Sequence, residues 1–520
     1  MSVNQVKAGA VLNYVLIGVN IFLGLLYTPY MLRMLGQREY GLYSLVASII
    51  AYLTLFDFGM GTAVVRYTAK FRTEGKIDES RSAFGMFFLL YTGVGIIAFI
   101  AGLCLCFNVD TLFDRTMTLE ELSRAKIMIL LLLVNLAVTF PMGIFNSIIT
   151  AYEEFVFQKV LNILRVVLST VVIVLLLHKG YKAIAMVVVQ TVFNLMVLAM
   201  NAFYCRYKLS IHLAFTKFKF TFVREVLTFS FWVFLSDIMS RIYWNIGQFI
   251  LGGYRGTVAV SVFALAVTLE LMYTTFSVGI SGVLLPRITS ITTMEHTESQ
   301  VSDLFIRVGR LQYSVLSLLL SGFVLFGRQF VALWAGAGYD QVYVIALIFF
   351  FSSLAPLLQN IGGQILIARN QMKYRSALLV CVASASLVLQ IILARPYGAI
   401  GCAIAVGLAL FVGQGILMNL YYRNKQKINI GLFWREIAKI SVIPLLLTIG
   451  GWFVIRYFEL DNILKLSTAI ALYTIVYIPL FWHTSMNADE RRLFVGLCKR
   501  LKHTVKSNKE LKGNMFFTDN

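Results

Sequence analysis

The sequence predicts an all-α polytopic membrane protein with about fourteen transmembrane helices. Two observations lead to this prediction. The chain has 520 residues, of which 59% are hydrophobic and only 13% charged, so it is far less polar than a soluble protein of this length. Apolar runs of about 18–25 residues, long enough to cross a bilayer as helices, recur from one end to the other. A membrane β-barrel would instead show alternating segments of about 10 residues.

Each expected span is one apolar run, and it ends where charged residues, glycine or proline interrupt the run. The connecting segments are short, so consecutive spans alternate in direction across the membrane. The fourteen spans expected, in order, are residues 10–32, 42–65, 83–107, 126–148, 158–178, 183–204, 227–251, 257–285, 304–327, 341–367, 376–394, 398–421, 438–456 and 466–483.

The positive residues that give the net charge of +20 are concentrated in every second loop along the chain. Lys and Arg gather in loops 66–81 and 206–224 and in the tail after 484, whereas loops such as 108–125 and 252–256 hold fewer. The positive-inside rule then places both termini in the cytoplasm. The basic tail is interpreted as an anchor on anionic lipid headgroups, with an interaction tail as the alternative. Nucleic-acid binding is not expected, because no aromatic stacking platform accompanies the charge.

An internal repeat links the two halves of the chain. Three segments of the first half match three of the second in the same order and at a nearly constant offset, with chance similarity as the alternative. The pairs are 56–61 with 276–281, 140–155 with 355–372, and 180–189 with 396–405. An even number of spans per repeat gives two lobes of the same orientation.

The repeat predicts two six-helix lobes followed by two further helices. The expected divisions are a first lobe at 1–215, a second lobe at 216–425, two C-terminal spans at 426–485, and a basic cytoplasmic tail at 486–520. Paired lobes around a central site are the architecture that alternating access requires.

Ionisable residues within the apolar runs are the candidates for function. In LSDIMSRIYWNIGQ, the polar residues Asp237, Arg241 and Asn245 are spaced i, i+4, i+8 and share one helix face. A charge at mid-bilayer costs about 2.5–3.5 kcal/mol, so this face should meet protein or water. A cavity wall with Arg241 offered to an anionic substrate and an internal salt bridge between Asp237 and Arg241 are both consistent with the pattern.

Other polar residues fall inside expected spans. Arg307 and Arg310 begin the ninth span, where snorkelling to the interface is an alternative to substrate binding. Pro141 and Pro356 interrupt two spans and permit kinks. The remaining intramembrane candidates are Asp57, Arg165, Glu270, Gln359, Asn360 and Gln364.

No catalytic motif appears. The six cysteines include no CxxC pair, and the five histidines are isolated. Walker, HExxH and GxSxG motifs are lacking as well. The sequence therefore predicts no catalytic residue, no metal site and no cofactor. A transporter is favoured over an enzyme.

The stretch TPYMLRMLGQREYGLYSLVASIIAYLTLFDFGMGTAVVRY at 28–67 resembles the start of bacterial polysaccharide and O-antigen flippases of the Wzx type. The shared features are a proline near the end of span 1, LG followed by EYGLY, and the DFG segment before a closing Arg-Tyr. These flippases belong to the MOP exporter superfamily, together with MATE multidrug exporters and lipid II flippases.

The resemblance implies a MATE-like fold of two six-helix lobes around a central cavity. It implies a bacterial inner-membrane protein that moves an oligosaccharide on undecaprenyl pyrophosphate from the cytoplasmic to the periplasmic leaflet. Membrane lipids and a polysaccharide polymerase are the further partners that it suggests.

The resemblance also suggests roles for the intramembrane candidates. Arg241, then Arg165 and Arg310, are the arginines expected to bind pyrophosphate. Arg307, Asn245, Gln359, Asn360 and Gln364 complete the expected substrate site. Asp57, Glu270 and Asp237 are the carboxylates that could couple transport to a proton or sodium gradient.

Three alternatives remain at this stage. A MATE-like multidrug or cation antiporter would favour acidic and aromatic cavity walls. A membrane glycosyltransferase or polymerase would need a larger extramembrane loop with clustered carboxylates. A scaffold without transport activity would look the same in sequence.

Overall fold

The computed structural model describes residues 5–215, 224, 238–239, 241–293, 298–368, 372–458, 460–488 and 490–492. Across these residues the secondary structure consists of helices joined by turns, with no strand. Eleven of the helices are long and apolar enough to cross a membrane. The predicted all-α membrane fold is therefore confirmed.

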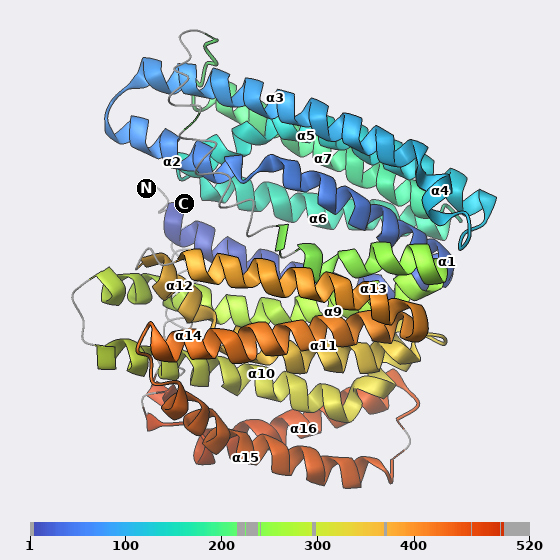
Figure 1. Cartoon of the computed structure of the whole chain (residues 1–520), viewed down its shortest axis with the longest axis vertical. Coiled ribbons are helices and arrows are strands. Elements are labelled where there is room, and N and C mark those ends of the chain that lie inside the picture. The colour runs from blue at the N-terminus through green and yellow to red at the C-terminus, as the bar shows by residue number, and fades with distance from the viewer. Residues whose placement is uncertain are drawn as a thin grey trace, which may run out of the picture. The chain divides into compact units, whose positions relative to one another are not determined.

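Three of the eleven apolar helices each contain a reversal. Gly36, Gly256 and Gly398 have φ of 75°, 78° and 57°, a left-handed conformation that glycine adopts without steric cost. Figure 1 shows α1 (Gln5–Leu53) and α13 (Met372–Leu410) turning back on themselves. When each of the three is divided at its glycine, the eleven helices give fourteen apolar segments within the described residues. The expected span at 227–251 is described only at 238–239 and from Arg241 onward.

The chain forms two compact units. The first contains Met1–Thr275, Val331–Ala355 and Asn370–Met418, and the second contains Phe276–Phe330, Pro356–Arg369 and Asn419–Asn520. The division into lobes expected from the internal repeat stays a prediction.

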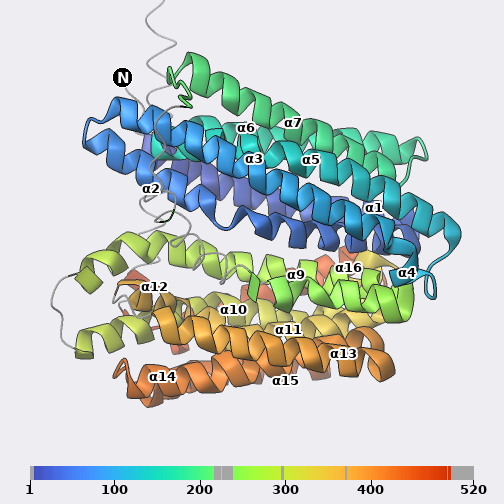
Figure 2. The same ribbon diagram turned by 45° about the horizontal axis from the view of Figure 1, so that its top comes forward.

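The first unit begins with a bundle whose helices follow one another along the chain. Figures 1 and 2 show α3, α5 and α7 side by side, and the first arm of α1 packs along α6. The helices of this bundle are α1, η1 (Thr54–Asp57), α2 (Met60–Thr73), α3 (Ile77–Phe107), α4 (Val109–Phe113), α5 (Leu119–Ala151), α6 (Phe155–His178) and α7 (Ala183–Tyr207).

Later helices belong to the first unit or to both units. α9 (Ile246–Thr293), α10 (Glu298–Ala335) and α11 (Asp340–Leu358) each have residues in both, whereas α13 and the π-helix η2 (Phe411–Leu417) belong to the first. Pro356 lies two residues before the end of α11, and α12 (Asn360–Ala368) follows after a break at Gln359. The tenth predicted span is thus two helices.

The second unit packs the C-terminal helices around part of α10. Phe305 of α10 packs against Phe433 of α15 (Ile430–Ile455) with ring centroids 5.0 Å apart. Ser317 of α10 forms a 2.8 Å hydrogen bond with Tyr477 of α16 (Ile463–Thr484). α15 begins eight residues before the predicted span at 438–456, because Asn429 caps it by accepting from the Leu432 amide. α14 (Met418–Asn424) precedes α15.

Lipid-facing surfaces explain the apolar side chains that remain exposed. Ile96, Ile97 and Ile100 of α3 are each more than half exposed, as are Leu472 and Ile475 of α16. Exposed patches of this kind destabilise a protein in water but suit contact with lipid tails. The buried core holds aromatic and aliphatic residues such as Phe84, Phe87, Leu42 and Met128.

Candidate functional site: a polar cavity at a broken helix

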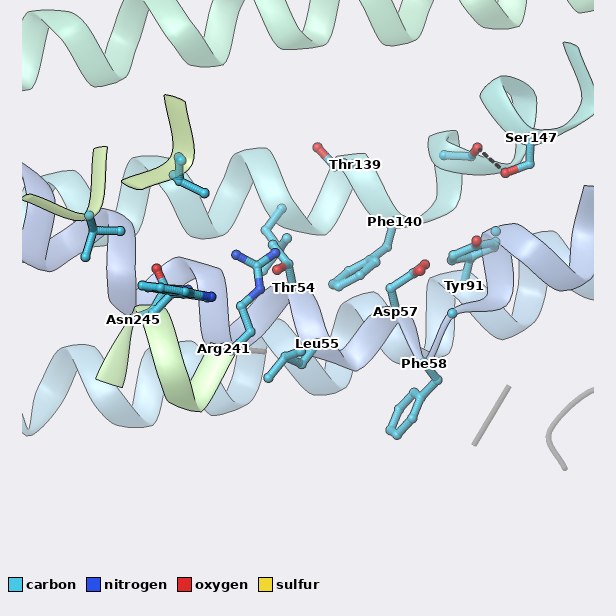
Figure 3. Close-up of a pocket in the computed structure, with 17 residues that line it drawn as sticks. Thr54, Leu55, Asp57, Phe58, Tyr91, Thr139, Phe140, Ser147, Arg241 and Asn245 are labelled. Carbon is cyan, nitrogen blue, oxygen red and sulfur yellow. Dashed lines mark hydrogen bonds between the residues drawn. The ribbon is translucent and has the colours of Figure 1, made fainter. Parts of the chain in front are cut away.

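The first unit contains a polar cavity of about 620 Å³ between its helices. Figure 3 shows Arg241 and Asn245 at one end and Asp57 with Tyr91 at the other, with Thr54 and Phe140 between them. The walls come from η1, the turn after it, α2, α3, α5, α9 and the segment that precedes α9. The lining residues are Thr54, Leu55, Asp57, Phe58, Gly59, Gly61, Tyr91, Leu136, Thr139, Phe140, Gly143, Ser147, Arg241, Trp244, Asn245, Val267 and Leu271.

A break in the second span forms one wall of the cavity. The α-helix changes to a 3₁₀ turn at Thr54–Asp57, and Phe58 and Gly59 then take left-handed φ values of 50° and 66°. The helix resumes at Met60. The sequence FDFGMG explains the break, because glycine accepts this conformation and a bulky residue such as Phe58 adopts it only at a cost. Helix ends leave backbone groups without intrahelical partners, so the break adds polarity to the wall.

Arg241 and Asn245 supply the basic and amide end. Both side chains are half-buried, and both line the cavity. The Tyr52 hydroxyl of α1 donates to the Arg241 carbonyl at 3.2 Å, which fastens this segment to α1. A turn at Asn245 separates it from α9. Asp237, predicted to share this face, lies outside the described residues.

Asp57 and Tyr91 form the opposite end. Figure 3 shows the Tyr91 ring and the Asp57 carboxylate next to each other at this end. Gly61 completes this end: a Cβ placed on it would lie 3.3 Å from Ser147 Oγ and 3.5 Å from the Tyr91 hydroxyl. The end is therefore rich in oxygen atoms and carries the Asp57 carboxyl group.

Arg165 lies outside the cavity but is connected to it. Its Nη1 donates to Asn194 Oδ1 at 3.3 Å. Asn194 Nδ2 in turn donates to Asn135 Oδ1 at 2.8 Å and to Thr139 Oγ1 at 2.9 Å. Thr139 lines the cavity. A chain of hydrogen bonds thus runs from α6 through α7 to the cavity wall on α5.

Arg310 is held by carboxylates in the second unit. It donates to Glu490 at 2.6 and 3.2 Å, to Glu436 at 3.0 Å, and to the Ser485 carbonyl at 3.1 Å. Its side chain is 5% exposed. The structure therefore places Arg310 in a buried ion-pair cluster and outside the cavity. Arg307, one turn earlier, is exposed and does not line the cavity.

The remaining predicted site residues are placed elsewhere. Gln359 donates to Asn419 Oδ1 at 2.7 Å in the second unit, next to Asn360. The side chain of Gln364 lies outside the described residues. Glu270 of α9 is buried and accepts from Thr274 at 2.7 Å, although its neighbours Val267 and Leu271 line the cavity. No group of three His, Cys, Asp or Glu in the described part of the chain could hold a metal ion.

Sequence reasoning missed several cavity residues. Tyr91, Thr139, Ser147 and Trp244 are single polar or aromatic residues in apolar runs, where they give no local signal. The two glycines of FDFGMG were the available clue, because paired glycines within a span predict an interrupted helix.

The helical fold of this chain is shared by several solved membrane transporters. The structure is similar to that of "Lipid II flippase MurJ, inward closed conformation", with a TM-score of 0.69 and 17% identity over 91% of this chain and 98% of that one. It is also similar to an inward-facing "multidrug resistance MATE family transporter of the MOP superfamily", with a TM-score of 0.57 and 15% identity over 82% and 97%. A MOP superfamily transporter from Pyrococcus furiosus aligns with a TM-score of 0.52 and 14% identity over 82% and 100%.

The chain belongs to the family described as "Polysaccharide biosynthesis protein", whose model matches residues 6–292. Among curated proteins, none matches this chain. The family and the fold confirm the resemblance seen in the residues that surround FDFGMG.

Proposed function

We propose that the protein flips an oligosaccharide linked to undecaprenyl pyrophosphate from the cytoplasmic to the periplasmic leaflet of a bacterial inner membrane. The observation that carries this proposal is a half-buried arginine, Arg241, facing a polar cavity within a membrane helix bundle. The family match to polysaccharide biosynthesis proteins and the MurJ-like fold support the same class of cargo.

The chemistry of the cargo explains why such a cavity is needed. A sugar hydroxyl moved from water to hydrocarbon costs several kcal/mol, roughly 4–8, unless it finds a hydrogen-bond partner. A polar cavity supplies those partners, while a polyprenyl chain can stay in the lipid. The planar guanidinium of Arg241 can bind two oxygens of a pyrophosphate at once, and the Asn245 amide beside it can donate to a third.

Transport against a gradient needs an energy source, and coupling to a proton or sodium gradient is part of this proposal. Glu270 is the preferred coupling group, because its carboxyl is buried beside the cavity wall formed by Val267 and Leu271. Asp57 lines the cavity itself and is therefore within reach of the cargo. A polysaccharide polymerase would receive the flipped product.

The test replaces Arg241 in cells whose surface glycan depends on this protein. Arg241→Ala is expected to reduce glycan display at least tenfold at unchanged protein abundance, and Arg241→Lys to restore part of it. The matched control is Arg456→Ala, an exposed arginine stacked on Trp452 at the end of α15, which should leave display unchanged. Normal display in the Arg241→Ala strain would reject the proposal.

Export of an organic cation is a second candidate, because Asp57 stands in a cavity that also contains Phe140 and Trp244. In that case Arg241→Ala would raise cation resistance or leave it unchanged, and Asp57→Asn would abolish it. Drug susceptibility of the same strains separates the two functions.

A further inference from the structure

The two ends of the cavity differ in charge and in hydrogen-bonding capacity. Arg241 and Asn245 present N–H donors at one end, whereas Asp57, Tyr91 and Ser147 present mainly oxygen at the other. An anionic phosphate is attracted to the first end and repelled by the Asp57 carboxylate at the second. A single cargo that fills both ends must therefore be anionic in one part and rich in hydroxyl groups in the next.

The volume of the cavity supports a cargo larger than a pyrophosphate. Binding sites for whole organic ligands commonly measure about 300–1,000 Å³, and this cavity has about 620 Å³. A pyrophosphate with one or two sugar rings fits that range. Phe140, which Figure 3 shows between the two ends, offers an apolar ring against which the C–H face of a sugar can pack.

The oxygen-rich end is suited to a neutral sugar. A carboxylate accepts hydrogen bonds from two hydroxyl groups, and the Tyr91 and Ser147 hydroxyls can donate or accept as the sugar requires. Gly61 keeps this space open, because an added Cβ would touch both of those hydroxyls. An acidic sugar such as a uronic acid would bring its own carboxylate against Asp57.

We propose that Asp57, Tyr91 and Ser147 form a subsite for the sugar attached directly to the pyrophosphate, and that this subsite selects a neutral sugar over an acidic one. The inference rests on the proposed function, and it assigns the specificity of the flippase to the wall formed by the helix break. Tyr91 lies beside the Asp57 carboxylate in the cavity wall, so both residues determine which glycan is accepted.

The test measures binding of three lipids to the purified full-length protein in lipid nanodiscs. The probes are undecaprenyl pyrophosphate, the same lipid carrying one N-acetylglucosamine, and the same lipid carrying one glucuronic acid. The wild-type protein is expected to bind the N-acetylglucosamine lipid about tenfold or more tightly than the other two, as hydrogen-bonding sites discriminate against analogues that lack or oppose their bonds.

Two kinds of variant then examine the subsite. Asp57→Asn and Tyr91→Phe are expected to reduce the preference for N-acetylglucosamine at least fivefold without lowering affinity for the bare pyrophosphate lipid. Gly61→Ala fills the subsite without changing charge and should have the same effect. It therefore provides an independent check if one of the polar variants folds poorly. Tyr181→Phe, at an exposed tyrosine between α6 and α7, is the matched control.

The outcomes distinguish the two proposals. If the wild type binds all three lipids equally, or if the subsite variants lose affinity for all three in parallel, the subsite is wrong while the flippase function stands. If the wild type binds none of the lipids and Arg241→Ala changes nothing, the proposed function fails and the subsite fails with it.

Discussion

The backbone of Gly41 lies directly against the carbonyl of Thr257, so closely that a Cβ added to Gly41 would overlap that oxygen. Two hydrogen bonds fasten the same region. Thr257 Oγ1 donates to Glu121 at 3.2 Å, and Thr116 Oγ1 donates to the Gly252 carbonyl at 2.6 Å. The second arm of α1, the start of α5 and the reversal of α9 therefore meet at one end of the first unit.

This contact predicts that Gly41→Ala destabilises the observed arrangement by about 1–3 kcal/mol, because the added methyl forces two backbones apart. Gly18→Ala is the control on the same helix, since nothing lies within 4 Å of its Cβ position. Alanine there should be neutral or stabilising by up to about 1 kcal/mol. Thermal unfolding monitored by tryptophan fluorescence measures both, and equal melting temperatures would contradict the close approach.

Arg310→Ala should unfold the second unit more easily by about 3–5 kcal/mol, because it leaves the buried Glu490 carboxylate without its cation. Arg307→Ala, at the exposed arginine one turn away, should change stability little. Size-exclusion chromatography after heating compares the two variants. If the Arg310→Ala protein is stable but no longer binds lipid-linked sugar, Arg310 belongs to the substrate site and not only to the ion-pair cluster.

Asn194→Leu should lower stability by about 1–3 kcal/mol, because Arg165 loses the amide oxygen that accepts its hydrogen bond, and Thr139 and Asn135 lose a donor. Asn194→Asp should be tolerated better than Asn194→Leu, since a carboxylate can accept from the arginine. Melting temperatures of the two variants provide the comparison, and identical losses would show that the contact with Arg165 contributes nothing.

Single-cysteine variants test whether water enters the cavity. In a background that lacks the six native cysteines, Arg241→Cys and Asn245→Cys should react with a charged, membrane-impermeant thiol reagent applied to inverted or ruptured vesicles. Glu270→Cys, at a side chain that is 2% exposed, should react much more slowly. Equal inertness at all three positions would show that the cavity is closed to water.

The orientation rests on the distribution of Lys and Arg, which predicts cytoplasmic termini. A reporter fused after residue 484 should be active in the cytoplasm, and one inserted in the loop at 179–182 should be active in the periplasm. Reversed signals from the two fusions would invert the topology and with it the proposed direction of transport.

Much of the fold and part of the cavity were predictable from the sequence for one physical reason. A charge inside hydrocarbon is costly, so Arg241 and Asp57 had to face a polar interior, and the structure brings both into one cavity. The number of spans followed from the length of apolar runs and from the short segments between them.

The ion-pair partners of Arg310 could not be predicted from the local sequence. Its charge resembles that of Arg241, but its partners Glu436 and Glu490 stand 126 and 180 residues away in sequence. No pattern within one helix reveals such pairing. Tyr91 and Ser147 were missed for the opposite reason, because a hydroxyl group in an apolar run is common, and only the fold brings these two to the broken helix.

The interruption between Thr54 and Met60 gives the cavity a polar wall that does not depend entirely on side chains. Main-chain amides and carbonyls keep their chemistry whatever residues surround them. Neighbouring positions on α3 and α5 can therefore change during evolution while the cavity wall keeps these polar groups, and under the proposed function each change could admit a different glycan. If the proposed cargo is correct, a scaffold of this kind can adapt to many surface sugars with few substitutions.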